Sequence, residues 1–173
     1  SSTDKSVASG AASYDVNITQ VATKGSYVGE IAQTAPTAQA ETLTFSGGLF
    51  ANTPYVLNLT AGMTATDIMN MINGDLKLKE NVVASLDGGK LKVESKKFGT
   101  SGNFTVYSNI TAGVDNSGIG VGSLGTKVTG VDVAGTINGE AATGSGRFLT
   151  GNTGNAKTEG LQIEYTGSST GLV

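Results

Sequence analysis

The sequence contains no cysteine, no histidine and no tryptophan among its 173 residues. The absence of cysteine excludes disulfides, thiolate chemistry and cysteine-type zinc sites. The absence of histidine removes the commonest general base and the commonest metal ligand. An enzyme would have to work with Asp, Glu, Lys, Ser, Thr or Tyr alone, so we expect a non-enzymatic protein without catalytic residues, cofactor or metal.

Charge and long apolar runs are also scarce. Charged residues make up 14% of the chain, and the formal net charge is −3. A negative balance argues against a nucleic-acid partner, which requires a basic surface. No apolar run approaches the roughly 18 residues of a membrane-spanning helix, and no signal peptide is recognised, so we expect no membrane partner. The abrupt first and last residues suggest a piece of a longer protein.

Glycine is abundant instead, at 26 residues, about twice its usual share. The stretch GEAATGSG, residues 139–146, resembles the start of a phosphate-binding loop. That loop requires Lys after its second glycine, where this chain has Ser145, and the nearest cation is Arg147. The alternating residues 131–137 lead instead into Asn138-Gly139, a strong signal for a tight hairpin turn. We therefore expect these glycines to shape turns and to bind no phosphate.

Alternation of apolar and polar residues predicts a chain of short strands. The predicted strands cover residues 13–21, 42–45, 55–59, 81–86, 90–95, 103–107, 131–137, 148–150 and 161–165.

One segment, residues 64–73, has a helical period instead. Thr64 is a good N-cap and Asp67 completes a capping box. Gly74 is expected to be the C′ residue that ends the helix, and the methionines Met69 and Met71 are expected to fill the core. Apolar residues on one face would pack this short helix on a sheet.

We therefore predict a mainly β protein with two small β-rich domains of short antiparallel strands and one short helix. The outer domain would comprise residues 1–36 and 127–173, and the inserted domain residues 37–126. Chain ends that lie close together favour this arrangement. Two consecutive domains divided near residue 110 are the alternative.

Two blocks of the sequence resemble flagellar proteins. Residues 43–108 resemble the IN motif module of flagellins and hook proteins, with Ile-Asn ending the helix and a strand of the V-x-A-S type after it. Residues 14–30, YDVNITQVATKGSYVGE, and the last third of the chain resemble the middle, or head, domains of the flagellar filament cap proteins, the hook-associated protein 2 family. The residues that carry these motifs are Tyr14, Val16, Ile18, Gln20, Ile72, Asn73, Ala84, Ser85, Leu91, Ser95, Gly135, Asn138 and Gly139.

The resemblance implies a structural role in flagellum assembly and motility. Cap proteins of this family form a ring at the extracellular tip of the filament and guide flagellin into place, so copies of this chain and flagellin are the implied partners. Tyr27, Phe50 and Tyr107 are candidates for exposed contact residues. Two alternatives remain open: a surface-exposed middle domain of a flagellin, or an adhesive module that binds host mucus or a surface receptor.

Overall fold

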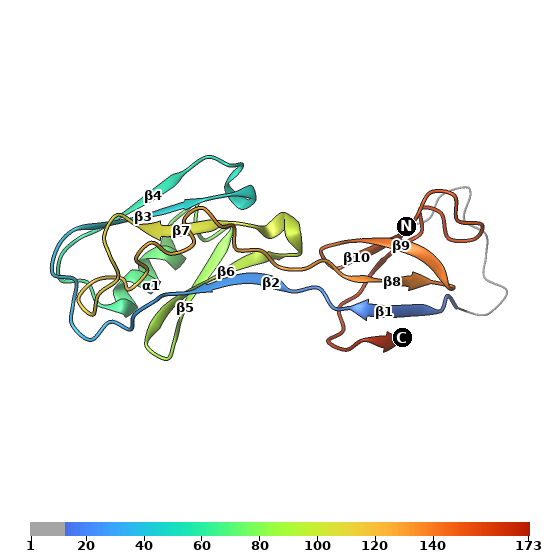
Figure 1. The fold of residues 1–173 in the computed structure, drawn as a ribbon, viewed down its shortest axis with the longest axis horizontal. Coiled ribbons are helices and arrows are strands. Elements are labelled where there is room, and N and C mark those ends of the chain that lie inside the picture. Colours follow the sequence, from blue (N-terminus) through green and yellow to red (C-terminus); the bar gives the residue numbers. More distant parts are fainter. Residues whose placement is uncertain (1–12) are drawn as a thin grey trace. The chain divides into compact units, whose positions relative to one another are not determined.

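The computed structural model describes residues 13–173 and is built mainly from β-strands (Figure 1). The described residues form twelve strands, one α-helix and two short 3-10 turns. Their contacts divide the chain into two compact units. Unit 1 comprises Ser1–Thr23, Phe98–Thr100 and Gly130–Val173, and unit 2 comprises Lys24–Lys97 and Ser101–Thr129. The mainly β fold with a single helix is confirmed for the described residues.

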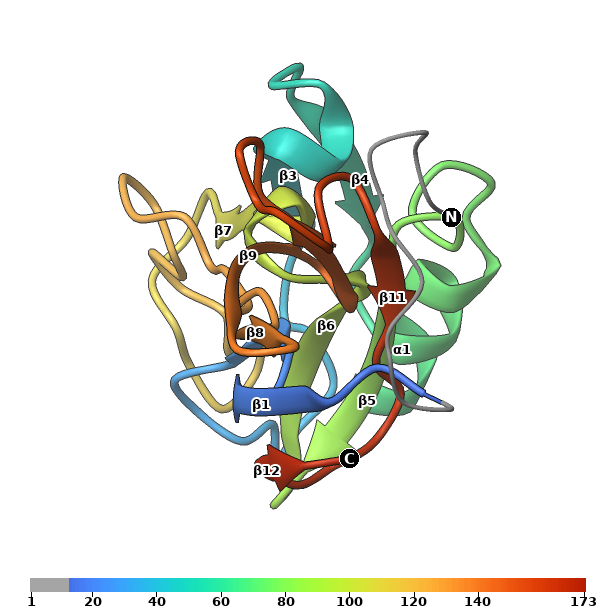
Figure 2. The ribbon, with the colours of Figure 1, turned by 90° about the vertical axis from the view of Figure 1, so that its right-hand side faces the viewer.

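Unit 1 is a six-stranded antiparallel sheet in the order β11-β10-β9-β8-β1-β12. Figure 2 shows β1 lying between β8 and the short β12. Its core is formed by Val16, Ile18, Ala22, Val133, Ile137 and Leu149. The strands are β1 (Val16–Gln20), β8 (Ala134–Ile137), β9 (Glu140–Ser145), β10 (Phe148–Gly151), β11 (Gln162–Glu164) and β12 (Gly171–Leu172).

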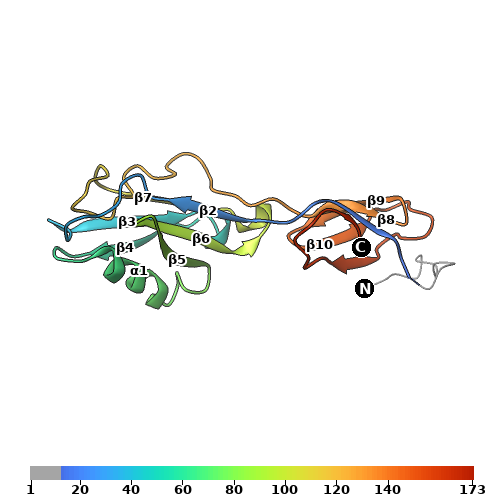
Figure 3. The ribbon, with the colours of Figure 1, turned by 90° about the horizontal axis from the view of Figure 1, so that it is seen from below.

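Unit 2 contains two three-stranded sheets, ordered β2-β6-β5 and β4-β3-β7, with helix α1 (Ala65–Gly74) against them (Figure 3). A single apolar cluster joins both sheets and the helix, with Leu43, Phe45, Ile68, Ile72 and Val93 fully buried. The strands are β2 (Lys24–Val28), β3 (Glu41–Ser46), β4 (Tyr55–Leu59), β5 (Val82–Asp87), β6 (Lys90–Phe98) and β7 (Thr105–Ser108), and the 3-10 turns are Gly48–Phe50 and Thr100–Gly102.

The segment that resembled a phosphate loop is a hairpin limb. Asn138 and Gly139 form the turn with φ of 50° and 74°, and the residues after them are strand β9, which pairs with β8. A Cβ placed on Gly144 would come within 1.6 Å of the carbonyl oxygen of Val133. Gly144 thus allows two backbone segments to approach closely, which confirms the expected use of glycine here.

The start of the helix is as predicted, and its end is not. Thr64 is the N-cap and forms a complete capping box with Asp67. Gly74 was expected outside the helix in a left-handed conformation, but it is the last helical residue, and Asp75 caps the end with extended backbone angles. Met69 packs on the core as expected, whereas Met71 is 38% exposed, which contradicts its assignment to the core.

Two strands, β2 and β12, were not predicted from the sequence. The chain passes from one unit to the other after residues 23 and 129, whereas the predicted domain boundaries follow residues 36 and 126. In addition, residues 98–100 belong to unit 1 although the residues on both sides of them belong to unit 2. Residues 101–129 belong to the same compact unit as residues 24–97. The first twelve residues of the predicted outer domain lie outside the described residues. Whether the two units are independent domains stays a prediction.

Candidate functional site

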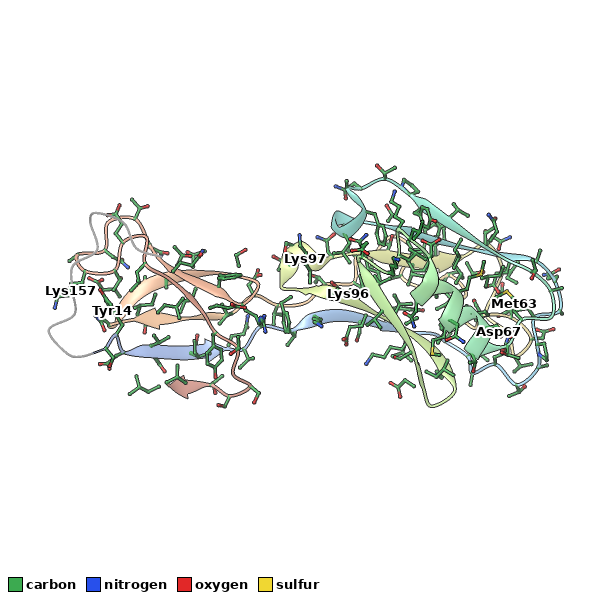
Figure 4. The ribbon with its side chains drawn as sticks, turned by 180° about the vertical axis from the view of Figure 1, so that it is seen from behind. Tyr14, Met63, Asp67, Lys96, Lys97 and Lys157 are labelled. Carbon is green, nitrogen blue, oxygen red and sulfur yellow. The ribbon has the colours of Figure 1, made fainter. Side chains whose placement is uncertain are left out.

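Polar side chains fix helix α1 of unit 2 at both ends. At its start, the Thr64 backbone N–H and hydroxyl both donate to the Asp67 carboxylate, at 2.8 and 2.7 Å. The hydrogen bonds from Thr64, first that of the side chain and then that of the backbone, hold the pKa of Asp67 below its ordinary value. Figure 4 shows Asp67 at this end of the helix, with Met63 nearby. The carboxylate is thus used for capping.

The last turn of α1 carries the Ile-Asn pair of the IN motif. Ile72 is fully buried in the core of unit 2. The side chain of Asn73 donates from Nδ2 to the carbonyl oxygen of Ala84, at 2.9 Å, and its Oδ1 accepts from the Ala84 N–H, at 2.8 Å. The motif therefore attaches the helix to strand β5 by one apolar side chain and one polar side chain.

Asp75 continues this attachment beyond the helix. Its carboxylate accepts from the Tyr55 hydroxyl at 2.6 Å and from the backbone N–H groups of Lys77 and Leu78, each at 2.9 Å. Burial alone would raise the pKa of Asp75, but the three hydrogen bonds, led by that of Tyr55, lower it overall. The same bond raises the pKa of Tyr55. These hydrogen bonds join the residues just after the helix to strand β4.

A buried carboxylate anchors the irregular segment that follows β7. Glu41 is 1% exposed, and it accepts from the Ser108 hydroxyl at 2.6 Å, from the Ser117 N–H at 2.9 Å and from the Ser117 hydroxyl. Asn116 adds local bonds that shape the same loop, including acceptance from the N–H groups of Gly113 and Gly118, each at 2.9 Å. The glycine-rich segment 111–125 contains no strand, and the Glu41 carboxylate attaches it to β3.

In unit 1 the corresponding anchor is Asp132. Its carboxylate accepts from the Gly146 N–H at 2.6 Å, the Thr100 hydroxyl at 2.7 Å and the Thr100 N–H at 3.2 Å. Burial acts to raise the pKa of Asp132, but these bonds, led by that of Gly146, lower it overall. One carboxylate thus joins residues 98–100 to the turn between β9 and β10.

The motif residues identified in the sequence do not converge on one site. In unit 1, Val16 and Ile18 are buried, and Tyr14 packs against the same core. The side-chain amide of Gln20 donates to the Asp132 carbonyl, and Gly135 lies against the Asn17 carbonyl. Asn138 and Gly139 form a turn. In unit 2, Ala84 and Leu91 are buried, Ser85 is exposed, and the buried Ser95 hydroxyl donates to the Lys97 carbonyl at 2.9 Å. Their shared feature is a structural role. Whether these motif residues also bind a partner stays a prediction.

The three candidate contact residues have different surroundings. Phe50 is 3% exposed, with its ring 6.1 Å from that of Phe45, so the prediction that it is exposed is wrong. It lies in a 3-10 turn that folds back on the core, which the sequence did not reveal. Tyr27 and Tyr107 are half-buried. Burial, followed by the charge of Glu30, raises the pKa of Tyr27.

Two exposed apolar side chains mark a surface of unit 2 that sequence reasoning missed. Val121 is 63% exposed and Leu124 is 60% exposed, and a hydrogen bond from the Leu124 N–H to the Val121 carbonyl, at 3.0 Å, holds them in one turn. We call this the 121–124 turn. Lys96 and Lys97, near the end of β6, are both exposed (Figure 4).

Residues 13–173 contain no group of three or more His, Cys, Asp or Glu side chains that could hold a metal ion. Over the same residues, no helix is long and apolar enough to cross a membrane. The carboxylates described above each have hydrogen-bond donors from the fold.

The chain forms two β-rich units and passes between them several times, and one of the two units contains a single capped helix. This is the fold of the flagellar cap protein FliD. The crystal structure of its D2-D3 domains from Escherichia coli matches with a TM-score of 0.58 at 19% identity, over 92% of this chain and 84% of that one. The D1-D2-D3 structure from the same organism matches with a TM-score of 0.54 at 17% identity, over 92% of this chain.

This chain spans about half of the longer FliD structure, with 49% of that chain covered. No family model and no curated protein matches the sequence. At these identities the likeness shows the fold, and it confirms the expectation that the chain has the fold of the middle domains of a flagellar cap protein.

Proposed function

We propose that this chain is the head region of a flagellar filament cap. It is a non-enzymatic assembly factor that associates with its own copies into a ring at the extracellular tip of the filament and guides flagellin insertion. The observation that carries this proposal is the likeness to FliD D2-D3, which extends over 92% of the chain. The opening strand resembles the same family, and the IN motif, which flagellins and hook proteins also carry, is in keeping with a flagellar protein.

The ring requires contacts of a particular kind. In a cyclic assembly each subunit uses two different patches, which meet head to tail and close by rotation. The 121–124 turn offers one such patch, because exposed apolar side chains that lie together often mark an interaction site. The turn lies in a segment pinned by Glu41, so ordering it would cost little entropy on association.

The first test of the proposal is genetic. The parent gene is deleted and then restored either intact or without the segment encoding residues 1–173. We expect the null strain to have hooks without filaments and to release monomeric flagellin into the medium, and the intact gene to restore filaments. Filaments of normal length in the null strain, without released flagellin, would exclude a cap.

The location of the protein separates the cap from the alternatives. Antibodies raised against this chain should label only the filament tip in electron microscopy. Label along the whole filament would favour a middle domain of a flagellin. Label at the tip together with binding of the purified chain to mucus would add an adhesive role.

The proposed contact has its own test. Val121→Ser with Leu124→Ser should reduce self-association of the parent protein in sedimentation by at least about tenfold, the effect of losing a small apolar contact. Leu76→Ser is the matched control, because Leu76 is 78% exposed elsewhere in unit 2. Equal effects of both changes would contradict a specific contact at the turn.

A further inference from the structure

Unit 1 contains a half-open cavity of about 280 Å³. It lies where the segment after β1, the end of β6, the turn between β9 and β10 and the loop after β11 come together. This size is at the lower end of the roughly 300–1,000 Å³ range of small-molecule pockets, so one large side chain would fill it. The lining residues are Val21, Ala22, Phe98, Arg147, Tyr165, Thr166, Gly167 and Ser168.

The cavity has an apolar side that the fold holds in place. Val21, Phe98 and Tyr165 pack against the core of unit 1, and Ala22 belongs to that core. The Tyr165 N–H donates to the Arg147 carbonyl at 2.8 Å, and its hydroxyl donates to the Ser169 carbonyl at 2.6 Å. These bonds fix both ends of loop 166–168, so the cavity is formed without a ligand.

Arg147 gives the cavity its charge. Its guanidinium lies 4.8 Å from the centre of the Phe98 ring and pairs with the Glu164 carboxylate at 2.7 Å. A guanidinium carries five N–H donors, and a single carboxylate engages at most two of them. No acidic side chain lines the cavity. Glu164 offsets the charge of Arg147, so what Arg147 offers an anion is its remaining N–H donors.

The opposite rim adds donors. The backbone N–H groups of Thr166, Gly167 and Ser168 have no hydrogen-bond acceptor among residues 13–173. Consecutive N–H groups of a loop and a nearby cation are the elements that capture a peptide carboxylate in other proteins.

We propose that this cavity binds the C-terminal residue of a peptide whose last side chain is apolar. The terminal carboxylate meets Arg147 and the rim of residues 166–168, and the side chain lies against Val21 and Ala22. A sugar fits less well, because the guanidinium already covers the face of the Phe98 ring on which a sugar would stack. A phosphate fits less well, because the lining contains one cation beside an apolar wall.

The test is an NMR titration of the whole chain, labelled with ¹⁵N, with three small probes. N-acetyl-leucine carries both the carboxylate and the side chain, N-acetyl-leucinamide lacks the charge, and acetate lacks the side chain. We expect shifts at the Gly167 amide and the Arg147 Nε with N-acetyl-leucine, and binding at least about tenfold weaker for the other two. This comparison uses the unmodified chain and does not depend on any variant folding.

Variants complete the design. Arg147→Gln should weaken binding of N-acetyl-leucine by at least about tenfold, and Arg147→Lys by less, because lysine keeps the charge and loses the fork of donors. Lys157→Gln removes an exposed charge elsewhere in unit 1 and should leave binding unchanged (Figure 4). The proposal would be overturned if N-acetyl-leucinamide or acetate bound as tightly as N-acetyl-leucine. It would also be overturned if glucuronate, added as a fourth probe, bound more tightly than N-acetyl-leucine.

Discussion

The side chain of Asn73 and the backbone of Ala84 bond to each other in both directions, at 2.9 and 2.8 Å. Strand β5, which contains Ala84, lies at the edge of its sheet. The amide of Asn73 thus reproduces one rung of a β-ladder, and it satisfies edge groups that would otherwise require water or another strand. This explains why asparagine, with its paired donor and acceptor, follows the buried Ile72 in the motif.

Removing that amide tests its contribution. Asn73→Ala leaves the N–H and the carbonyl of Ala84 without their partner, so we expect the free energy of unfolding to fall by about 1–3 kcal/mol. Urea denaturation followed by circular dichroism measures the change. Asn70→Ala is the control, because Asn70 is exposed on the same helix and should change stability by less than about 0.5 kcal/mol. Equal stability of the two variants would show that the bonds from Asn73 to Ala84 contribute nothing.

Two glycines respond in opposite directions to the same substitution. Gly74→Ala adds a methyl group at the end of α1, where no atom lies within 4 Å and φ is not positive, so we expect stabilisation of about 0.4–1 kcal/mol. Gly144→Ala drives a methyl group into the Val133 carbonyl and should destabilise the protein by more than about 1 kcal/mol. Thermal denaturation of both variants decides the signs. Stabilisation by Gly144→Ala would contradict the close approach of the two segments.

The aromatic side chains of Phe50 and Phe148 provide a second contrast. Phe50 is buried beside Phe45, and we expect Phe50→Ala to cost about 3–5 kcal/mol. Phe148 is 43% exposed on β10, so Phe148→Ala should cost clearly less. Chemical denaturation of the two variants gives both values. A small cost at Phe50 would mean that its 3-10 turn detaches easily from the core.

The lowered pKa of Asp132 predicts a pH dependence of stability. Folding favours the ionised carboxylate, so its contribution is fully present above the unfolded value of about 4 and is lost as the pH falls through the lowered pKa. Asp132→Asn removes this contribution, so the stability difference from the unmodified chain should be largest near pH 7 and shrink below about pH 4. Urea denaturation between pH 2.5 and 7 measures it.

Asp87→Asn is the comparison variant for that experiment, because Asp87 is the exposed last residue of strand β5 in unit 2. The stability of both variants is measured over the same pH range. A difference for Asp132→Asn that grows toward low pH would contradict the assigned hydrogen bonds to Gly146 and Thr100.

Local signals in the sequence predicted the elements that depend on neighbouring residues. The capping box of Thr64 and Asp67 lies within one helical turn, and the hairpin turn at Asn138-Gly139 joins two strands that pair directly. In such cases the residues that form the structure are close enough in the chain to be read together.

Elements that depend on distant partners were missed. Strand β2 pairs with β6 and shows no alternation of its own, and the two-residue β12 exists because it reaches β1. The burial of Phe50 follows from a turn that folds over Phe45, and the role of Asp132 follows from Thr100, 32 positions away. The candidate cavity likewise combines residues from four separate segments. No local pattern marks such combinations.

The interrupted path of the chain through unit 1 also has a consequence for the order of folding. The Thr23 hydroxyl accepts from the Val131 N–H, and these residues are 108 positions apart. Closing a loop of that length costs entropy before any contact forms, unless the intervening residues are already compact. Unit 2 supplies most of those residues and has its own core. We therefore expect the backbone amides of unit 2 to gain protection first in pulsed hydrogen exchange. The amides of unit 1 should gain protection later, because a folded unit 2 reduces the entropy cost of bringing residues 23 and 131 together.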